Sequence, residues 1–222
     1  MTTTIPDYET AAAKAAETLI KHHIGSAPIE PLPILKSMRG ALVLSFAEMA
    51  EEAGMDRQNV IMLFGKKNHD AVTFVKVGDE RLRYVVAYNQ RLPFYMMQRA
   101  LARELGHIVL GHDGSRPEDV RTEEAVAFAR HSLCPRPLIR IIQDAGVPLT
   151  VELIGNVTGC YERCLAGLRK TPGARVPAEL NRLVREQFTD YAENLLDFYS
   201  ALSADEPSAL ADLGSFMDNY VE

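Results

Sequence analysis

The sequence predicts an α+β fold, in which a small antiparallel sheet packs on one amphipathic helix and a mainly helical C-terminal region follows. Two strand-like runs, 71–77 and 81–88, flank a short glycine-containing turn at 78–80, which is the pattern of a β-hairpin. In residues 93–112, apolar side chains recur at spacings of three and four, as they do on one buried helix face. Helical periodicity dominates from residue 118 onward.

The elements before the hairpin follow from local signals. Residues 7–23 predict an amphipathic helix that ends before Gly25 and Pro28, and a short helix is expected from about Pro33. Residues 41–46 are apolar and β-branched enough for a strand, and residues 47–54 then turn helical.

The second hairpin strand has two distinct faces, because side chains alternate along a strand. Leu82, Tyr84, Val86 and Tyr88 are expected on one face, with Arg81 and Arg83 on the other. The arginine face could guide an extended peptide by strand addition, or it could simply protect an edge strand by its charge.

After the hairpin, the pattern indicates helices separated by prolines and glycines. Residues 118–134 and 137–146 each predict a helix, residues 150–170 predict two helical pieces around Gly155, and residues 176–195 predict one long amphipathic helix. We divide the chain into a first domain at 1–137, a helical C-terminal region at 138–200 and an acidic tail at 201–222.

Composition excludes several classes of function. The 222 residues carry a formal net charge of −6, which disfavours a nucleic-acid partner held by bulk electrostatics. No apolar run is long enough for a membrane span, and the first residues show no export signal, so a cytoplasmic location and no membrane partner are expected. Three cysteines, including Cys160 and Cys164 at helical spacing, fit buried thiols in a reducing compartment.

The strongest chemical signal lies in residues 98–114. The zinc-protease motif H-E-x-x-H places two histidines one helical turn apart, so that both bind one zinc ion while the glutamate activates the bound water. Here Glu104 and His107 occupy the second and last positions of the motif, but Arg103 occupies the first. Arginine stays protonated and offers no lone pair, so Arg103 cannot bind a metal. On the next predicted helix, Glu124 is the best candidate for a further ligand.

The order of helix, proline-containing segment, strand, hairpin, motif helix and the run from Glu124 to Pro135 resembles the ImmA/IrrE family of metallopeptidase-like proteins, over roughly residues 8–170. The resemblance implies a zincin-like fold, Glu104 as catalytic base, and His107 and Glu124 as zinc ligands. It also implies descent from proteases, often encoded on phages and mobile elements, that cleave a partner repressor. Two positions depart from the family pattern: Arg103 replaces the first histidine ligand, and Val126 stands where the family usually has asparagine.

Replacement ligands are not expected to restore the site. His112 would lie about 140° around the helix from His107, and Cys134 would face roughly away from Glu124. We therefore expect Arg103 to act as a metal surrogate that pairs with Glu104 or Glu124. If Arg103 pairs with a carboxylate in this way, we expect the site to hold Zn²⁺ only weakly. An empty metal site agrees better with the charge of Arg103.

Three functions follow from these observations. The first is an inactive or metal-deficient relative of repressor-cleaving metallopeptidases that recognises a partner protein, with a transcriptional repressor as the candidate. The second is an active metallopeptidase with an altered metal site, built on Glu104, His107, Glu124 and an unforeseen ligand. The third, more distant, is a DNA-binding regulator that uses residues 150–170 as a helix-turn-helix.

Overall fold

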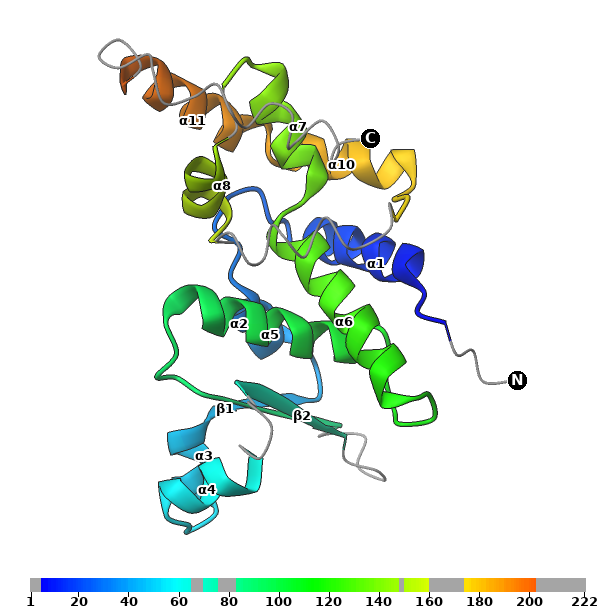
Figure 1. Cartoon of the computed structure of the whole chain (residues 1–222), viewed down its shortest axis with the longest axis vertical. Helices are drawn as coiled ribbons and strands as arrows, with labels where there is room; N and C mark the ends of the chain where they lie inside the picture. The colour runs from blue at the N-terminus through cyan, green and yellow to red at the C-terminus, as the bar shows by residue number, and fades with distance from the viewer. Residues whose placement is uncertain (1–4, 65–69, 76–82, 148–149, 160–173, 203–222) are drawn as a thin grey trace. The chain divides into compact units, whose positions relative to one another are not determined.

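The computed structural model describes residues 5–64, 70–75, 83–147, 150–159 and 174–202, and the chain divides into two compact units (Figure 1). Unit 1 holds residues 1–6 and 30–126, and unit 2 holds residues 7–29 and 127–222. The α+β class predicted from the sequence is confirmed, because a small sheet in unit 1 is combined with helices in both units.

Unit 1 carries the whole sheet and the motif helix. Its described elements are α2 (Pro31–Ser37), β1 (Ala41–Ser45), α3 (Phe46–Glu52), α4 (Arg57–Phe64), β2 (Ala71–Val75), β3 (Tyr84–Tyr88), α5 (Phe94–Val109) and the first turns of α6 (Glu118–Leu133).

The sheet has the strand order β1-β3-β2, so β3 is its central strand. The predicted hairpin pairing is confirmed, because β2 runs antiparallel to β3 with Thr73 opposite Val86. The sheet as a whole is mixed, since β1 runs parallel to β3. The chain order explains this arrangement. After β1, α3 and α4 lead into β2, which runs opposite to β1, and β3 then pairs antiparallel with β2 and so runs in the direction of β1. The central position of β3 also corrects the expectation that its arginine-bearing face belongs to an edge strand.

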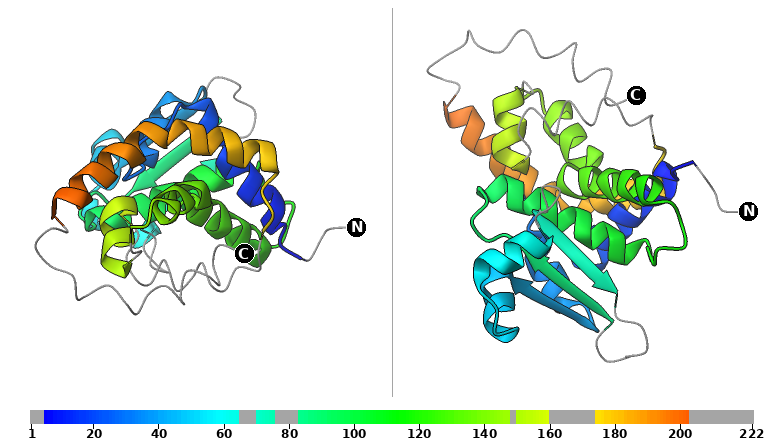
Figure 2. Two further views of the ribbon diagram at one scale, coloured as in Figure 1. Left: turned by 90° about the horizontal axis from the view of Figure 1, so that it is seen from above. Right: turned by 60° about the horizontal axis from the view of Figure 1, so that its bottom comes forward.

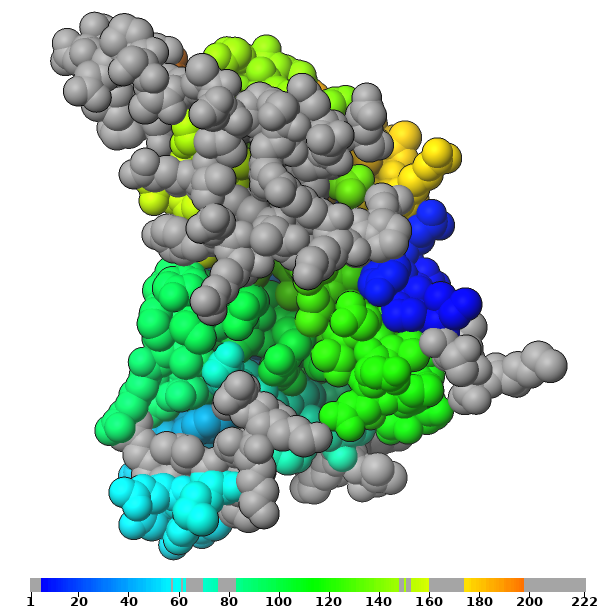
Figure 3. All heavy atoms as spheres, viewed as in Figure 1, coloured from blue at the N-terminus to red at the C-terminus, as the bar shows by residue number. Residues whose placement is uncertain are grey.

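Helices cover both faces of the sheet (Figure 2). On one face, α5 packs on β2 and β3, and α2 packs on β1 and α5. On the other face, Phe46 and Ala50 of α3 and Val60 of α4 form a buried cluster with Ala87 of β3. Figure 3 draws atoms of this helix pair in cyan at the lower end of the view, and Met62 of α4 is 67% exposed.

Two unit 1 helices show how local sequence sets their starts. At α3, Ser45 and Glu48 form a capping box, in which each side chain accepts a hydrogen bond from the backbone N–H of the other residue. The sequence reading missed α4, although Asp56 marks its start by accepting a hydrogen bond from the backbone N–H of Gln58 at 2.8 Å.

Among the described residues of unit 2, all regular elements are helices. Its elements are α1 (Tyr8–Lys21), the remaining turns of α6, α7 (Arg136–Asp144), α8 (Val151–Thr158), α10 (Ala178–Gln187) and α11 (Thr189–Leu202). Helix α10 packs against α1 and α7, and α11 also packs against α7. A face of buried alanines on α1, at positions 11, 12, 15 and 16, lets neighbouring backbones approach closely.

Two helix predictions in unit 2 need correction. Gly155 lies inside α8 and does not divide it, because the helix continues to Thr158 and ends at Gly159, which adopts a φ of 68°. The long helix expected over 176–195 is two helices that meet at the fully buried Phe188.

Several sequence predictions lie outside the described residues. These are the hairpin turn at 78–80, the residues Arg81 and Leu82, the helical piece containing Cys160 and Cys164, and residues 203–222 of the acidic tail. Within the described part of the chain, no helix is long and apolar enough to cross a membrane.

Candidate functional site

Helix α5 presents the three motif residues to one cavity of unit 1. Its apolar face buries Leu101, Leu105 and Ile108, and this packing fixes the rotation of the helix on the sheet. Arg103, Glu104 and His107 then line a cavity of about 470 Å³. The other walls are contributed by β2, by Tyr84 of β3, by the loop 112–114 and by the first turns of α6.

Arg103 is held on two sides. Its Nε and Nη2 donate hydrogen bonds to Oε1 of Glu104 at 3.1 and 3.0 Å, and Nη2 also donates to the backbone carbonyl of Ala71 at 3.2 Å. The side chain is 29% exposed, so part of the guanidinium faces the cavity. The pairing with Glu104 is the one that the surrogate hypothesis expects, whereas Glu124 has other partners.

Glu104 is buried, with only 3% of the residue exposed. Burial raises the pKa of its carboxyl group, and the charge of Arg103 together with contacts to Thr73 opposes that rise. Because an isolated buried carboxylate is costly, Arg103 supplies the counter-charge that favours the ionised form of Glu104.

The contact with Ala71 lies at the outer edge of the sheet. The backbone N–H of Asn89 donates to the carbonyl of Asp70 at 2.9 Å, which continues the β2–β3 ladder. Since hydrogen-bonded and non-hydrogen-bonded pairs alternate in an antiparallel ladder, Ala71, Thr73 and Val75 direct their backbone groups away from β3. Arg103 therefore caps one outward carbonyl of the edge strand β2.

A second polar chain connects the remaining motif residues. Nδ1 of His107 lies 2.8 Å from Nδ1 of His112, and Nε2 of His112 lies 3.0 Å from Oε2 of Glu124. Nη1 of Arg116 donates to the same carboxylate oxygen at 2.7 Å. His112 and Glu124 are both buried, so this chain runs from the cavity into the interior of unit 1.

The hydrogen bonds of this chain select the histidine tautomers. Burial lowers the pKa of His112, and burial, His112 and nearby arginines lower the pKa of His107 to about 3, so both rings are neutral near pH 7. Neutral His112 donates from Nε2–H to Glu124 and must accept at Nδ1. His107 then donates from Nδ1–H and keeps its lone pair on Nε2.

The position of His112 corrects the expectation that it points away from the site. The 100° step per residue applies only within a helix, and α5 ends at Val109 with Leu110 as its cap. Gly111 then adopts a φ of 67°, which turns the chain back toward α5. The sequence reading also missed Arg116, which lies in the loop before α6 and carries no motif signal. Cys134 is buried and does not line the cavity.

The donor set in this arrangement does not fit a zinc ion. Both nitrogens of His112 are engaged, Oε2 of Glu124 is shared by two donors, and Arg103 brings a positive charge to the position of a ligand. Within the described residues, no group of three or more His, Cys, Asp or Glu side chains is placed to hold a metal ion. A catalytic zinc site normally needs three protein ligands.

Comparison with known proteins identifies the domain. Residues 57–150 match the family model of the IrrE N-terminal-like domain, a region that runs from α4 through α7 and includes the cavity-lining residues of α5 and α6. No curated protein matches the chain. No solved structure matches it either. The match covers Arg103, Glu104, His107 and Glu124, and it supports an IrrE/ImmA-like, metallopeptidase-type domain at residues 57–150.

Proposed function

We propose that this chain recognises an extended segment of a partner protein, such as a transcriptional repressor, without depending on a bound zinc ion. The observation that carries the proposal is the set of hydrogen bonds from Arg103 to Glu104 and to the carbonyl of Ala71. A guanidinium is permanently charged, so it can balance buried carboxylates where its family relatives use a metal ion.

The two carboxylates of the site each have a guanidinium partner. Arg103 pairs with Glu104, and Arg116 pairs with Glu124. In a metallopeptidase of this family, the glutamate that corresponds to Glu104 activates a water molecule. This role requires an accessible carboxylate oxygen. Here Oε1 of Glu104 accepts two N–H groups from Arg103. This pairing stabilises the site and lowers the basicity of Glu104.

The cavity suits an extended peptide. Its wall includes the edge strand β2, and the outward backbone groups that Arg103 does not occupy could pair with another strand. Val75 at the end of β2 is 38% exposed and lines the same cavity. Backbone pairing along β2 would give affinity, and the side chains that line the cavity would give specificity.

The alternative is a peptidase with an altered metal site. The observation that favours it is the tautomer of His107, which keeps a lone pair on Nε2 while lining the cavity. In that case Glu104 would be the base, and the metal would be held by His107, Glu124 and a further ligand. Zinc-dependent cleavage of a bound peptide would distinguish this alternative from recognition alone.

A displayed library of random peptides tests the proposal with the full chain. We expect enriched peptides to bind the native protein, to stay intact by mass spectrometry with or without zinc, and to lose binding to Val75→Arg. Leu42→Arg is the matched control, because Leu42 is 40% exposed on β1, the opposite edge strand. Equal loss in both variants, or no effect of Val75→Arg, would overturn recognition along β2.

A further inference from the structure

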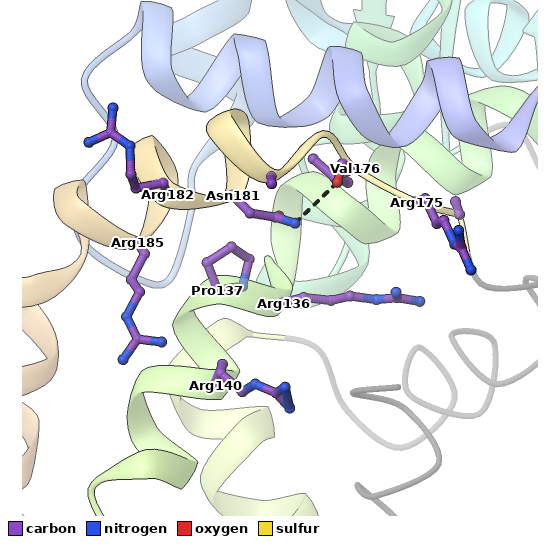
Figure 4. A pocket seen from close by; sticks show the side chains of 10 residues that line it. Arg136, Pro137, Arg140, Arg175, Val176, Asn181, Arg182 and Arg185 are labelled. Atoms are coloured by element: carbon purple, nitrogen blue, oxygen red, sulfur yellow. Dashed lines mark hydrogen bonds between the residues drawn. The ribbon is translucent and has the colours of Figure 1, made fainter.

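Unit 2 contains a cavity that has no part in the site on α5. It has a volume of about 500 Å³ and lies between the start of α7 and the start of α10 (Figure 4). Five arginines line it, from both helices and from the segment before α10: Arg136, Arg140, Arg175, Arg182 and Arg185. Such a concentration is unexpected in a chain whose formal net charge is −6.

Only part of this positive charge is balanced by ion pairs. Arg182 pairs with Glu179 at 2.6 Å and with Glu186, and Arg185 pairs with Asp144 at 2.8 Å. Among the residues that the structure describes, Arg140 and Arg175 form no ion pair, and both are exposed. With respect to the described part of the chain, the cavity therefore presents guanidinium groups without carboxylate partners to solvent.

The two helix starts add to this charge. The first turns of α7 and α10 both line the cavity, and the residues that precede them, Pro135 and Pro177, provide no side-chain cap. The first backbone N–H groups of a helix lack partners within the helix, and the helix dipole makes that end positive. Anions bind readily in such places. The start of α10 supplies most of this contribution, because at α7 Pro137 has no N–H and the N–H of Leu138 donates to the carbonyl of Pro135 at 3.0 Å.

One side-chain hydrogen bond and several apolar residues also shape the cavity. The side chain of Asn181 donates a hydrogen bond to the carbonyl of Val176 at 3.3 Å, which ties the segment carrying Arg175 onto α10 (Figure 4). Pro137, Val176 and Ala174 supply apolar walls beside the guanidinium groups. The site thus combines a charged side with an apolar side.

We propose that this cavity binds the phosphate group of a small phosphorylated molecule. Guanidinium groups bind phosphate oxygens with paired hydrogen bonds, and a doubly charged phosphate monoester matches the unbalanced charge. A volume of about 500 Å³ suits a small-molecule ligand, whose remainder would lie on the apolar walls. A nucleic-acid backbone carries the same group, but the net charge of −6 opposes a long polyanion.

The test is calorimetric titration of the full chain with inorganic phosphate and with pyrophosphate at low ionic strength. We expect saturable binding to one site, tighter for pyrophosphate, and weakened at least tenfold in the double variant Arg140→Gln/Arg175→Gln. The matched control is Arg39→Gln/Arg91→Gln, which removes the same charge from exposed positions in unit 1 and should bind as the native protein does.

Three results would overturn the proposal. One is the absence of saturable binding, or an equal loss in both double variants. A second is a single-stranded DNA 20-mer that binds more tightly than pyrophosphate and depends on Arg140 and Arg175, which would assign the cavity to nucleic acid. The third is phosphate binding that appears only after the acidic residues at 205, 206, 212 and 218 are neutralised, which would assign the cavity to the protein's own acidic segment.

Discussion

His107 and His112 share a hydrogen bond of 2.8 Å between their Nδ1 atoms, although only His107 lies on α5. The bond exists because the chain leaves the helix at Leu110 and turns back through Gly111. His112 then connects His107 to Glu124, so the last residue of the motif is oriented by a buried carboxylate. The tautomer of His107 therefore depends on His112 and Glu124 as well as on His107 itself.

Nuclear magnetic resonance can read these tautomers directly. At pH 7 we expect His107 to be protonated at Nδ1 and His112 at Nε2, because Glu124 accepts a hydrogen bond from His112. Long-range proton–nitrogen correlation spectra of the imidazole rings measure both states. Glu124→Gln should allow His112 to exchange tautomers, whereas a His107 ring protonated at Nε2 in the native protein would contradict the assignment.

Gly111 should be required for this arrangement. Its φ of 67° is unfavourable for a side chain, so Gly111→Ala should lower the free energy of unfolding by about 1 kcal/mol. Gly146→Ala is the matched control, because Gly146 has a φ of 77° in unit 2 and open space around it. Urea denaturation should show similar losses for both variants. Only Gly111→Ala should shift the imidazole signals of His107 and His112, and unchanged signals would show that the turn does not position His112.

The pair formed by Arg103 and Glu104 should be strongly coupled. Arg103→Met keeps much of the side-chain length but leaves a buried carboxyl group without its counter-charge, so we expect a loss of about 2 kcal/mol. Adding Glu104→Gln should recover part of that loss, because the second variant removes the unpaired charge. A double-mutant cycle in urea gives the coupling. Strictly additive losses would mean that the ion pair does not stabilise the site.

Stability should fall in mild acid through the buried histidines. The pKa values of His107 and His131 are lowered to about 3 and about 4, against 6.5 for an unperturbed histidine. At pH values between 6.5 and these lowered pKa values, the unfolded chain binds more protons than the folded chain does. The stability present above pH 6.5 is therefore lost as the pH falls, by up to about 1.4 kcal/mol per pH unit for each histidine.

The contribution of His107 can be isolated by comparing the native protein with His107→Asn. Urea denaturation at pH 7, 6 and 5 should show a shallower loss of stability for the variant, since one buried group that must stay neutral has been removed. The other carboxyl and histidine groups are common to both proteins. Identical slopes would mean that His107 is protonated as easily in the folded state as in the unfolded chain.

Sequence patterns were sufficient for the elements that depend on local spacing. The apolar stripe of Leu101, Leu105 and Ile108 predicted α5, and the alternating runs predicted the β2–β3 pairing. The parallel partner of β3 could not be predicted, because β1 lies some 40 residues earlier in the chain and periodicity does not specify which strands pair. The domain boundaries at 137 and 200 stay predictions.

For the candidate site, sequence patterns identified Glu104, His107 and Glu124, but not all of the side chains that form hydrogen bonds with them. Charge alone predicts a pairing of Arg103 with Glu104 or Glu124. The structure shows the pairing with Glu104, which is adjacent to Arg103 on one helix and within reach of its long side chain. His112 was wrongly excluded, because helix geometry was extended past the end of α5. Arg116 was missed because a loop arginine becomes a partner of Glu124 only through the turn that precedes α6.

The central claim is that Arg103 takes the place of a metal ion, and zinc content tests it most directly. The full chain, purified without a chelator or a histidine tag, is analysed by mass spectrometry beside Arg103→His and the double variant Arg103→His/His107→Ala. The account predicts no stoichiometric zinc in the native protein, one zinc per chain in Arg103→His, and none in the double variant. One zinc per chain in the native protein, lost on His107→Ala, would contradict it.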